Sequence, residues 1–149
     1  MSRGLEGNIV LDTGVIVEML NGSKSGAYVK TELQGGTLQA WTGELNIGEI
    51  RYLICRREGW SRSLQITRDL LDTNLFRIFS SREFIESAAQ MKCSRALSIV
   101  DCVTLSAGEK LQYPVLFSSH ELELDKEIKK AQFKIGIIFL EDLLYESHA

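Results

Sequence analysis

Four carboxylate residues occupy positions from which an α/β protein can do chemistry. They are Asp12, Glu49, Asp101 and Glu121. If they converge at one edge of a sheet, their mutual repulsion favours protonation of some of them unless a cation lies between them. Mg²⁺ or Mn²⁺ is the natural occupant, because these ions prefer hard oxygen ligands and retain bound waters. A site of this kind acts on phosphate groups.

Each acid also has a structural explanation of its own. Asp12 directly follows the apolar run 9–11, where it either caps the next helix or stands at the carboxyl end of a buried strand, the usual place for ligands in α/β sheets. Glu121 follows a second apolar run, 115–117, after a few polar residues. Alone, neither position distinguishes a helix cap from a functional group.

The other two acids lie on predicted helices. Ser98 opens a helix with a capping-box pattern, so Asp101 falls in its first turn. Glu49 lies on the flank of the apolar stripe of a helix expected over 44–58. A carboxylate at such a boundary is costly to desolvate unless something compensates its charge.

Strands and helices alternate along the chain and would position these acids. Strands are predicted over 9–11, 38–41, 115–117 and 136–140, and residues 74–79 form either a strand or an extended edge. Helices are predicted over 15–20, 27–34, 44–58, 61–72, 80–94, 98–111, 122–132 and 141–145. This alternation predicts a three-layer α/β/α sandwich around a mostly parallel sheet.

Composition indicates an ordinary folded protein. The chain has 149 residues, of which 44% are hydrophobic and 25% charged, so we expect one domain over 1–149 with a flexible polar lead over 1–7. No apolar run reaches the length of a membrane span and no secretory signal is evident, so a cytoplasmic location is expected. The net charge of -3 argues against a surface that wraps nucleic acid non-specifically.

The cysteines show no metal-binding spacing. Cys55, Cys93 and Cys102 are scattered without a CxxC pair, which predicts reduced, structural thiols. With only two histidines in the chain, a structural zinc site is not expected, and a metal would be a hard cation held by carboxylates.

Several segments together resemble the PIN domain, and most closely the VapC-type toxin ribonucleases of toxin–antitoxin pairs. The likeness rests on Val10–Thr13, on the run from Glu44 to Gly59, on Ser98–Cys102 and on Val115–Phe117 with the acids after it. It covers the chain from about Ile9 to about Leu144. No single one of these motifs is specific to the PIN domain, but their order and spacing together are.

The resemblance implies that Asp12, Glu49, Asp101 and Glu121 line a site for Mg²⁺ or Mn²⁺. Many members carry Thr-x-Asp after the fourth strand, where this chain has Ser118, Ser119 and His120, so Ser119 stands in for the principal Asp. This departure weakens a second metal position and leaves Glu121, or else Glu123, as the fourth acid. Thr13 and Ser119 would offer hydroxyls to water or phosphate.

The implied activity is metal-dependent cleavage of RNA phosphodiester bonds, with a small antitoxin as inhibitor and a homodimer as the expected assembly. Arg51 and Arg56 belong to a basic stretch that forms either a groove for RNA phosphates or a solvated helix face. Trp41 and Trp60 would serve a partner interface or the core.

Other functions fit less well. A haloacid-dehalogenase-like phosphatase needs a second Asp two residues after the first, where this chain has Gly14. A response-regulator receiver needs an acidic pair that is not evident. The main alternative is a PIN-like domain that binds RNA or protein without catalysis, which the altered fourth acid makes plausible.

Overall fold

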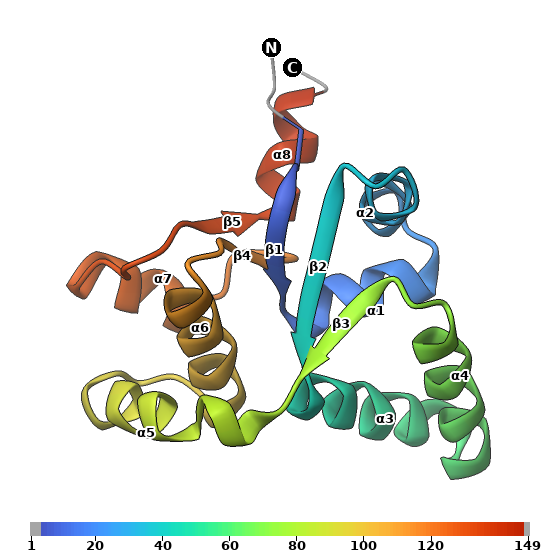
Figure 1. The fold of residues 1–149 in the computed structure, drawn as a ribbon, viewed down its shortest axis with the longest axis horizontal. Coiled ribbons are helices and arrows are strands. Elements are labelled where there is room, and N and C mark those ends of the chain that lie inside the picture. The colour runs from blue at the N-terminus through green and yellow to red at the C-terminus, as the bar shows by residue number, and fades with distance from the viewer. Residues whose placement is uncertain (1–3, 148–149) are drawn as a thin grey trace.

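A five-stranded sheet forms the centre of the computed structural model, which describes residues 4–147 and the side chains as far as residue 144 (Figure 1). The strands are β1 (Gly7–Leu11), β2 (Leu38–Gly43), β3 (Phe76–Phe79), β4 (Val115–Phe117) and β5 (Ile137–Phe139). The helices are α1 (Thr13–Asn21), α2 (Lys24–Gln34), α3 (Glu44–Glu58), α4 (Trp60–Asp72), α5 (Ile85–Ser94), α6 (Ile99–Leu111), α7 (Leu122–Lys130) and α8 (Leu140–Ser147), with a 3₁₀ turn, η1 (Ser81–Glu83).

The strands lie in the order β3-β2-β1-β4-β5, and every neighbouring pair is parallel. β1 is central, with Ile9 opposite Ala40 in β2 and Leu11 opposite Leu116 in β4. Because all strands run the same way, the residues that follow β1, β2 and β4 meet at one edge of the sheet. The α/β fold with a parallel sheet is confirmed.

Helices pack on both faces of the sheet, so each face has its own apolar cluster. One cluster joins β1 and β2 to α1, α2 and α3 and to Leu140 at the start of α8, while the other joins β4 and β5 to α5, α6 and α7. Ile9 and Leu11 point into the first cluster and Val10 into the second, all at most 1% exposed. Burial on both faces explains why this strand is apolar at consecutive positions.

The predicted helix over 80–94 is wrong at its start. Ser80 does cap a turn, but that turn is the short η1, and α5 begins at Ile85. Phe84 separates η1 from α5 with a φ of -120°, which is not helical. Its ring is buried edge-on against Phe79 at a centroid distance of 5.0 Å. The capping pattern correctly located the turn at Ser80, but the contact of Phe84 with Phe79 prevents the turn from continuing into α5.

Of the lead predicted over 1–7, residues 1–3 lie outside the described range. Leu5 packs into the first apolar cluster at 6% exposure, and its N–H donates to the Tyr28 hydroxyl at 3.2 Å. Gly7 already begins β1. Within residues 4–147, no helix has both the length and the apolar character needed to span a bilayer.

Candidate functional site

A cavity of about 740 Å³ lies at the edge of the sheet where β1 and β4 end. Its walls come from α1, α3, the end of α5 with the loop that follows, the start of α6, and the segment between β4 and α7. Six carboxylates line it: Asp12, Glu18, Glu49, Asp101, Glu121 and Glu123. The four acids predicted from the sequence are therefore in one lining.

Asp12 is fixed at the base of this cavity by the ends of two strands. Its N–H donates to the carbonyl oxygen of Leu116 at 2.9 Å, which continues the pairing of β1 with β4. Its side chain caps α1, where Oδ2 accepts the N–H of Gly14 at 3.4 Å. Burial raises the pKa of Asp12 to about 7, and the nearby charge of Asp101 adds to the shift.

Glu49 is oriented by a chain of buried polar groups. The Thr13 hydroxyl donates to Glu49 Oε1 at 2.6 Å, and Asn46 Nδ2 donates to Thr13 Oγ1 at 3.0 Å. The same amide nitrogen lies 3.3 Å from Oγ1 of Thr104 on α6. Thr13, Asn46 and Thr104 are all at most 6% exposed. This chain joins α1, α3 and α6 behind the cavity.

Asp101 and Glu121 face the cavity from the starts of two helices. Ser98 caps α6 by accepting the Asp101 N–H at 3.1 Å, which confirms the predicted cap and places Asp101 in the first turn. Glu121 is the N-cap residue of α7, but its side chain makes no cap hydrogen bond. Burial and then the charge of Glu121 raise the pKa of Asp101 to about 6.

Negative charge in this cavity is not balanced by the protein. Among the described residues, none of the six carboxylates has a Lys, Arg or His nitrogen within 4.0 Å. Lys92 is the basic residue of the lining, and its Nζ donates to the carbonyl oxygen of Leu97 at 2.6 Å. A set of oxygen donors without an ion-pair partner, two of which, Asp12 and Asp101, have raised pKa values, fits a hard divalent cation.

The structure does not bring the other predicted binding groups into this lining, apart from Thr13. Ser118 lines the cavity instead of Ser119, close to Gly14. Arg51 turns to α4, where its Nε donates to Thr67 Oγ1 at 3.2 Å. Arg56 lies over the ring of Tyr52, 4.9 Å from its centroid.

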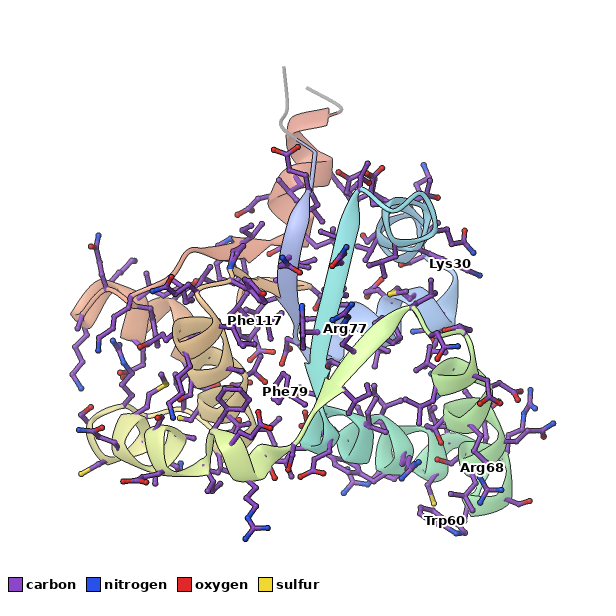
Figure 2. The ribbon with its side chains drawn as sticks, in the orientation of Figure 1. Lys30, Trp60, Arg68, Arg77, Phe79 and Phe117 are labelled. Atoms are coloured by element: carbon purple, nitrogen blue, oxygen red, sulfur yellow. The ribbon has the colours of Figure 1, made fainter. Side chains whose placement is uncertain are left out.

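The remaining arginines of the basic stretch are also elsewhere. Arg57 and Arg62 line a separate cavity between α3 and α4, and Arg68 lies on α4 at the right-hand edge of Figure 2. None of the three lines the acidic cavity. The basic stretch therefore does not adjoin the acids directly.

His120 lies outside the cavity lining and is held between two helices. Its Nδ1 is 2.9 Å from Asp125 Oδ1 on α7, and its Nε2 is 2.7 Å from Asp142 Oδ2 on α8. The hydrogen bonds to Asp125 and then to Asp142 raise the pKa of His120. The backbone N–H of His120 donates to Glu141 Oε1 at 2.7 Å.

Sequence reasoning missed several residues of the site. Glu18 and Lys92 line the cavity from positions that look like ordinary solvated helix residues. Asn46 was not predicted, although an amide on an otherwise apolar stripe is itself a signal of a buried polar network. Ser118 could have been favoured over Ser119, since it directly follows β4.

A comparison with protein families matches the PIN domain over residues 9–130. The fold is also similar to that of solved structures. A DNA-bound VapBC from Salmonella typhimurium has a TM-score of 0.65 at 11% identity, covering 89% of this chain and 98% of that one. No curated protein sequence matches.

Two further structures share the fold. VapBC2 from Rickettsia felis, bound to a DNA fragment from its promoter, has a TM-score of 0.62 at 12% identity, with 88% of this chain and 97% of that chain covered. VapC20 from Mycobacterium tuberculosis, a toxin that cleaves the sarcin-ricin loop, has a TM-score of 0.57 at 18% identity, with 72% and 86% covered. At these identities the likeness concerns the fold.

Proposed function

The chain belongs to the PIN domain family, and from that premise we propose that it is a metal-dependent endoribonuclease, the toxin of a toxin–antitoxin pair. The observation that carries the proposal is the cavity in which Asp12, Glu49, Asp101 and Glu121 meet without a basic partner. VapC20, a toxin that cleaves the sarcin-ricin loop, shares the fold and supports RNA as the substrate class.

These four acids would hold Mg²⁺ or Mn²⁺. When bound, such an ion lowers the pKa of a coordinated water and stabilises charge on the phosphate and leaving oxygens. Carboxylates with raised pKa values fit this role, since the ion replaces the protons that Asp12 and Asp101 otherwise hold.

The chain's own groups orient the substrate and the ligands. Thr13 and Asn46 fix Glu49 through the hydrogen bonds described above. Lys92, at the cavity wall, offers positive charge to a phosphate oxygen, and the Ser118 hydroxyl offers a donor. Together they replace the predicted contributions of Arg51, Arg56 and Ser119.

The direct test measures cleavage of varied single-stranded RNAs by inhibitor-free protein. We expect cleavage with Mg²⁺ or Mn²⁺ and none with a chelator. Asp12→Asn abolishes it, whereas the matched control Asp72→Asn, an exposed carboxylate at the end of α4, leaves it unchanged. Equal cleavage by wild type and Asp12→Asn would contradict the proposal.

A second candidate is a domain of the same fold that binds RNA or protein without cutting. Ser119, which stands in for the family's principal Asp after the fourth strand, favours it. The same experiment separates the two, since this candidate predicts RNA binding in a gel-shift assay with no metal-dependent products.

We also propose a small antitoxin as inhibitor, a homodimer and a cytoplasmic location. VapBC structures share the fold, which supports the antitoxin. Exposed apolar side chains on α3 and α4 offer an interface: Tyr52 is 44% exposed, Leu53 38% and Trp60, at the lower right of Figure 2, 56%. Trp41 is half-buried and donates to Asn8 Oδ1, so it serves the sheet surface instead.

Light scattering tests the dimer. We expect twice the chain mass at micromolar concentration and a shift toward monomer in Trp60→Ala. A strict monomer at that concentration would count against this part of the proposal and leave the nuclease proposal standing.

A further inference from the structure

His120, Glu141 and Asp142 form a second cluster of metal-binding side chains, separate from the acidic cavity. Their ligand atoms all lie within 4.8 Å of one another, and none of the three lines that cavity. The cluster joins the segment after β4 to the first turn of α8. All three residues are exposed, so an ion from solution reaches them directly.

The imidazole of His120 is held in place before any ligand binds. Its ring stacks on Phe139 with a centroid distance of 3.7 Å and an interplanar angle of 25°. Phe139 ends β5 and is itself 7% exposed, so the ring rests on a rigid part of the sheet. The stacking fixes the directions in which both ring nitrogens point.

The two ring nitrogens have different surroundings. Nδ1 faces a single carboxylate, Asp125 Oδ1 at 2.9 Å, on α7. Nε2 faces Asp142 at 2.7 Å, and Glu141 lies next to it in the chain. Metal-binding histidines typically donate one N–H to a carboxylate and bind the ion through the other nitrogen. Here Asp125 can accept the N–H of Nδ1, and an ion bound by Nε2 would replace the direct contact of Nε2 with Asp142.

Charge at the cluster also favours a cation. Three carboxylates lie around His120: those of Asp125 and Asp142 contact the ring nitrogens, and that of Glu141 accepts the backbone N–H. Within the described part of the chain, no Lys or Arg nitrogen lies within 4.0 Å of any of them. Even a protonated imidazole therefore leaves negative charge in excess, which a divalent ion would neutralise.

We propose that Nε2 of His120 and the carboxylates of Glu141 and Asp142 bind a zinc-type divalent cation, with Asp125 accepting the N–H of Nδ1. An imidazole and two carboxylates, completed by water, are a tetrahedral donor set of the kind zinc accepts. A nitrogen ligand also distinguishes this site from the all-oxygen cavity, which suits Mg²⁺. The site is independent of the proposed nuclease function.

The sequence did not suggest this site, because its ligands form no short motif. His120 is separated from Glu141 and Asp142 by α7 and β5, and the parallel pairing of β4 with β5 brings the two segments together. An ion bound here would tie the segment before α7 to the start of α8. We therefore expect a higher melting temperature with zinc bound.

Co²⁺ is the probe for the test, because tetrahedral Co²⁺ has strong visible ligand-field bands and octahedral Co²⁺ in an all-oxygen site does not. The full chain is titrated with Co²⁺ in excess Mg²⁺, and the bands should appear with one equivalent and be displaced by Zn²⁺. His120→Ala removes them. Asp142→Asn, an exposed substitution that leaves the core intact, weakens them.

Two matched controls locate the site. His148→Ala changes the chain's other histidine, which lies outside the described residues, and Asp12→Asn changes the acidic cavity; both should retain the bands. Asp125→Asn should lower the affinity for Co²⁺ by about 10- to 100-fold, as expected of a carboxylate that orients a metal-binding histidine.

Three results would overturn the proposal: no tetrahedral bands in the wild type, bands retained in His120→Ala, or bands lost in His148→Ala. Far-UV circular dichroism of each variant verifies that it is folded. RNA cleavage is measured separately, so loss of this site and failure of the nuclease proposal give different results.

Discussion

The Thr13 hydroxyl lies 2.6 Å from Oε1 of Glu49 and donates its hydrogen to that carboxylate. This contact joins the first residue of α1 to the middle of α3, and Asn46 continues it by donating to Thr13 at 3.0 Å. Thr13, the residue after Asp12, thus holds the Glu49 carboxylate at the cavity wall.

Thr13→Val removes that donor at nearly constant volume. We expect RNA cleavage to fall by about 10- to 100-fold, as for other losses of groups that orient a metal-binding side chain. Stability should fall by about 1–3 kcal/mol, because the buried Asn46 amide loses an acceptor. Thr13→Ser keeps the hydroxyl and should restore most of the activity. Equal activity in both variants would show that Glu49 needs no such orientation.

Asp12→Asn should inactivate the protein and yet stabilise its metal-free form at pH 8. Asparagine caps a helix as well as aspartate does, so α1 keeps its cap. The substitution removes a charged group whose burial raises its pKa to about 7. We expect a gain on the order of 1–3 kcal/mol in chelator, measured by urea unfolding. A loss of stability at pH 8 would mean that the charge is compensated.

Metal-free protein should become less stable as the pH rises from about 4 to about 7 through these groups. The pKa values of Asp12 and Asp101 are raised from an ordinary 3.8 to about 7 and about 6, so in that window the folded chain holds more protons than the unfolded chain. Saturating Mg²⁺ favours the ionised acids and should remove the trend. Thermal melts across this pH range, with and without Mg²⁺, measure it, with Asp12→Asn as the control.

Gly14→Ala should destabilise the protein although alanine favours a helix. A Cβ at this position would lie 2.5 Å from Ser118 Oγ and 3.3 Å from Ser118 Cβ. We expect a cost of about 1–3 kcal/mol and displacement of the Ser118 hydroxyl from the cavity. Removing the obstructing side chain with Ser118→Gly should restore stability in the double variant. Additive effects of the two changes would contradict this contact.

Arg51→Met and Lys92→Met should separate fold from function. Arg51 connects α3 to α4, where its Nε donates to Thr67 and its carbonyl accepts the Ser63 hydroxyl. Loss of the Nε–Thr67 hydrogen bond should cost about 0.5–1.5 kcal/mol of stability and leave the KM for RNA unchanged. Lys92 lines the cavity, so its loss should raise KM. The opposite pattern would restore Arg51 as an RNA-binding residue.

Local signals predicted most of the fold. α3 has the bounds expected from the sequence, because Gly43 and Gly59 flank a run with apolar residues at helical spacing. The buried strands were recognisable from consecutive β-branched and apolar residues, and their parallel arrangement followed from the helices between them. Two helix starts were wrong. α2 begins at Lys24 after the N-cap Ser23 instead of at residue 27, and α5 begins at Ile85, where the packing of Phe84 on Phe79 is a contact between segments that no local pattern encodes.

The same division applies to the site. The four acids could be proposed because parallel strands end at one edge, and a carboxylate after such a strand or in the first turn of a helix faces that edge. The distinction between Ser118 and Ser119 depends on the turn after β4, in which one residue changes the direction of a side chain. His120 and Arg51 are directed by partners on other elements, Asp142 and Thr67, which spacing along the chain does not reveal.

The central position of β1 also sets when the acidic cavity can assemble during translation. β1 leaves the ribosome first, but Val10 pairs with Val115 in β4, and Glu121 and Glu123 follow that strand. Contacts so distant in sequence form late in folding. A nascent or prematurely terminated chain that carries Asp12 and Glu49 therefore lacks one wall of the cavity. The complete acid cluster can form only after the ribosome has synthesised α7.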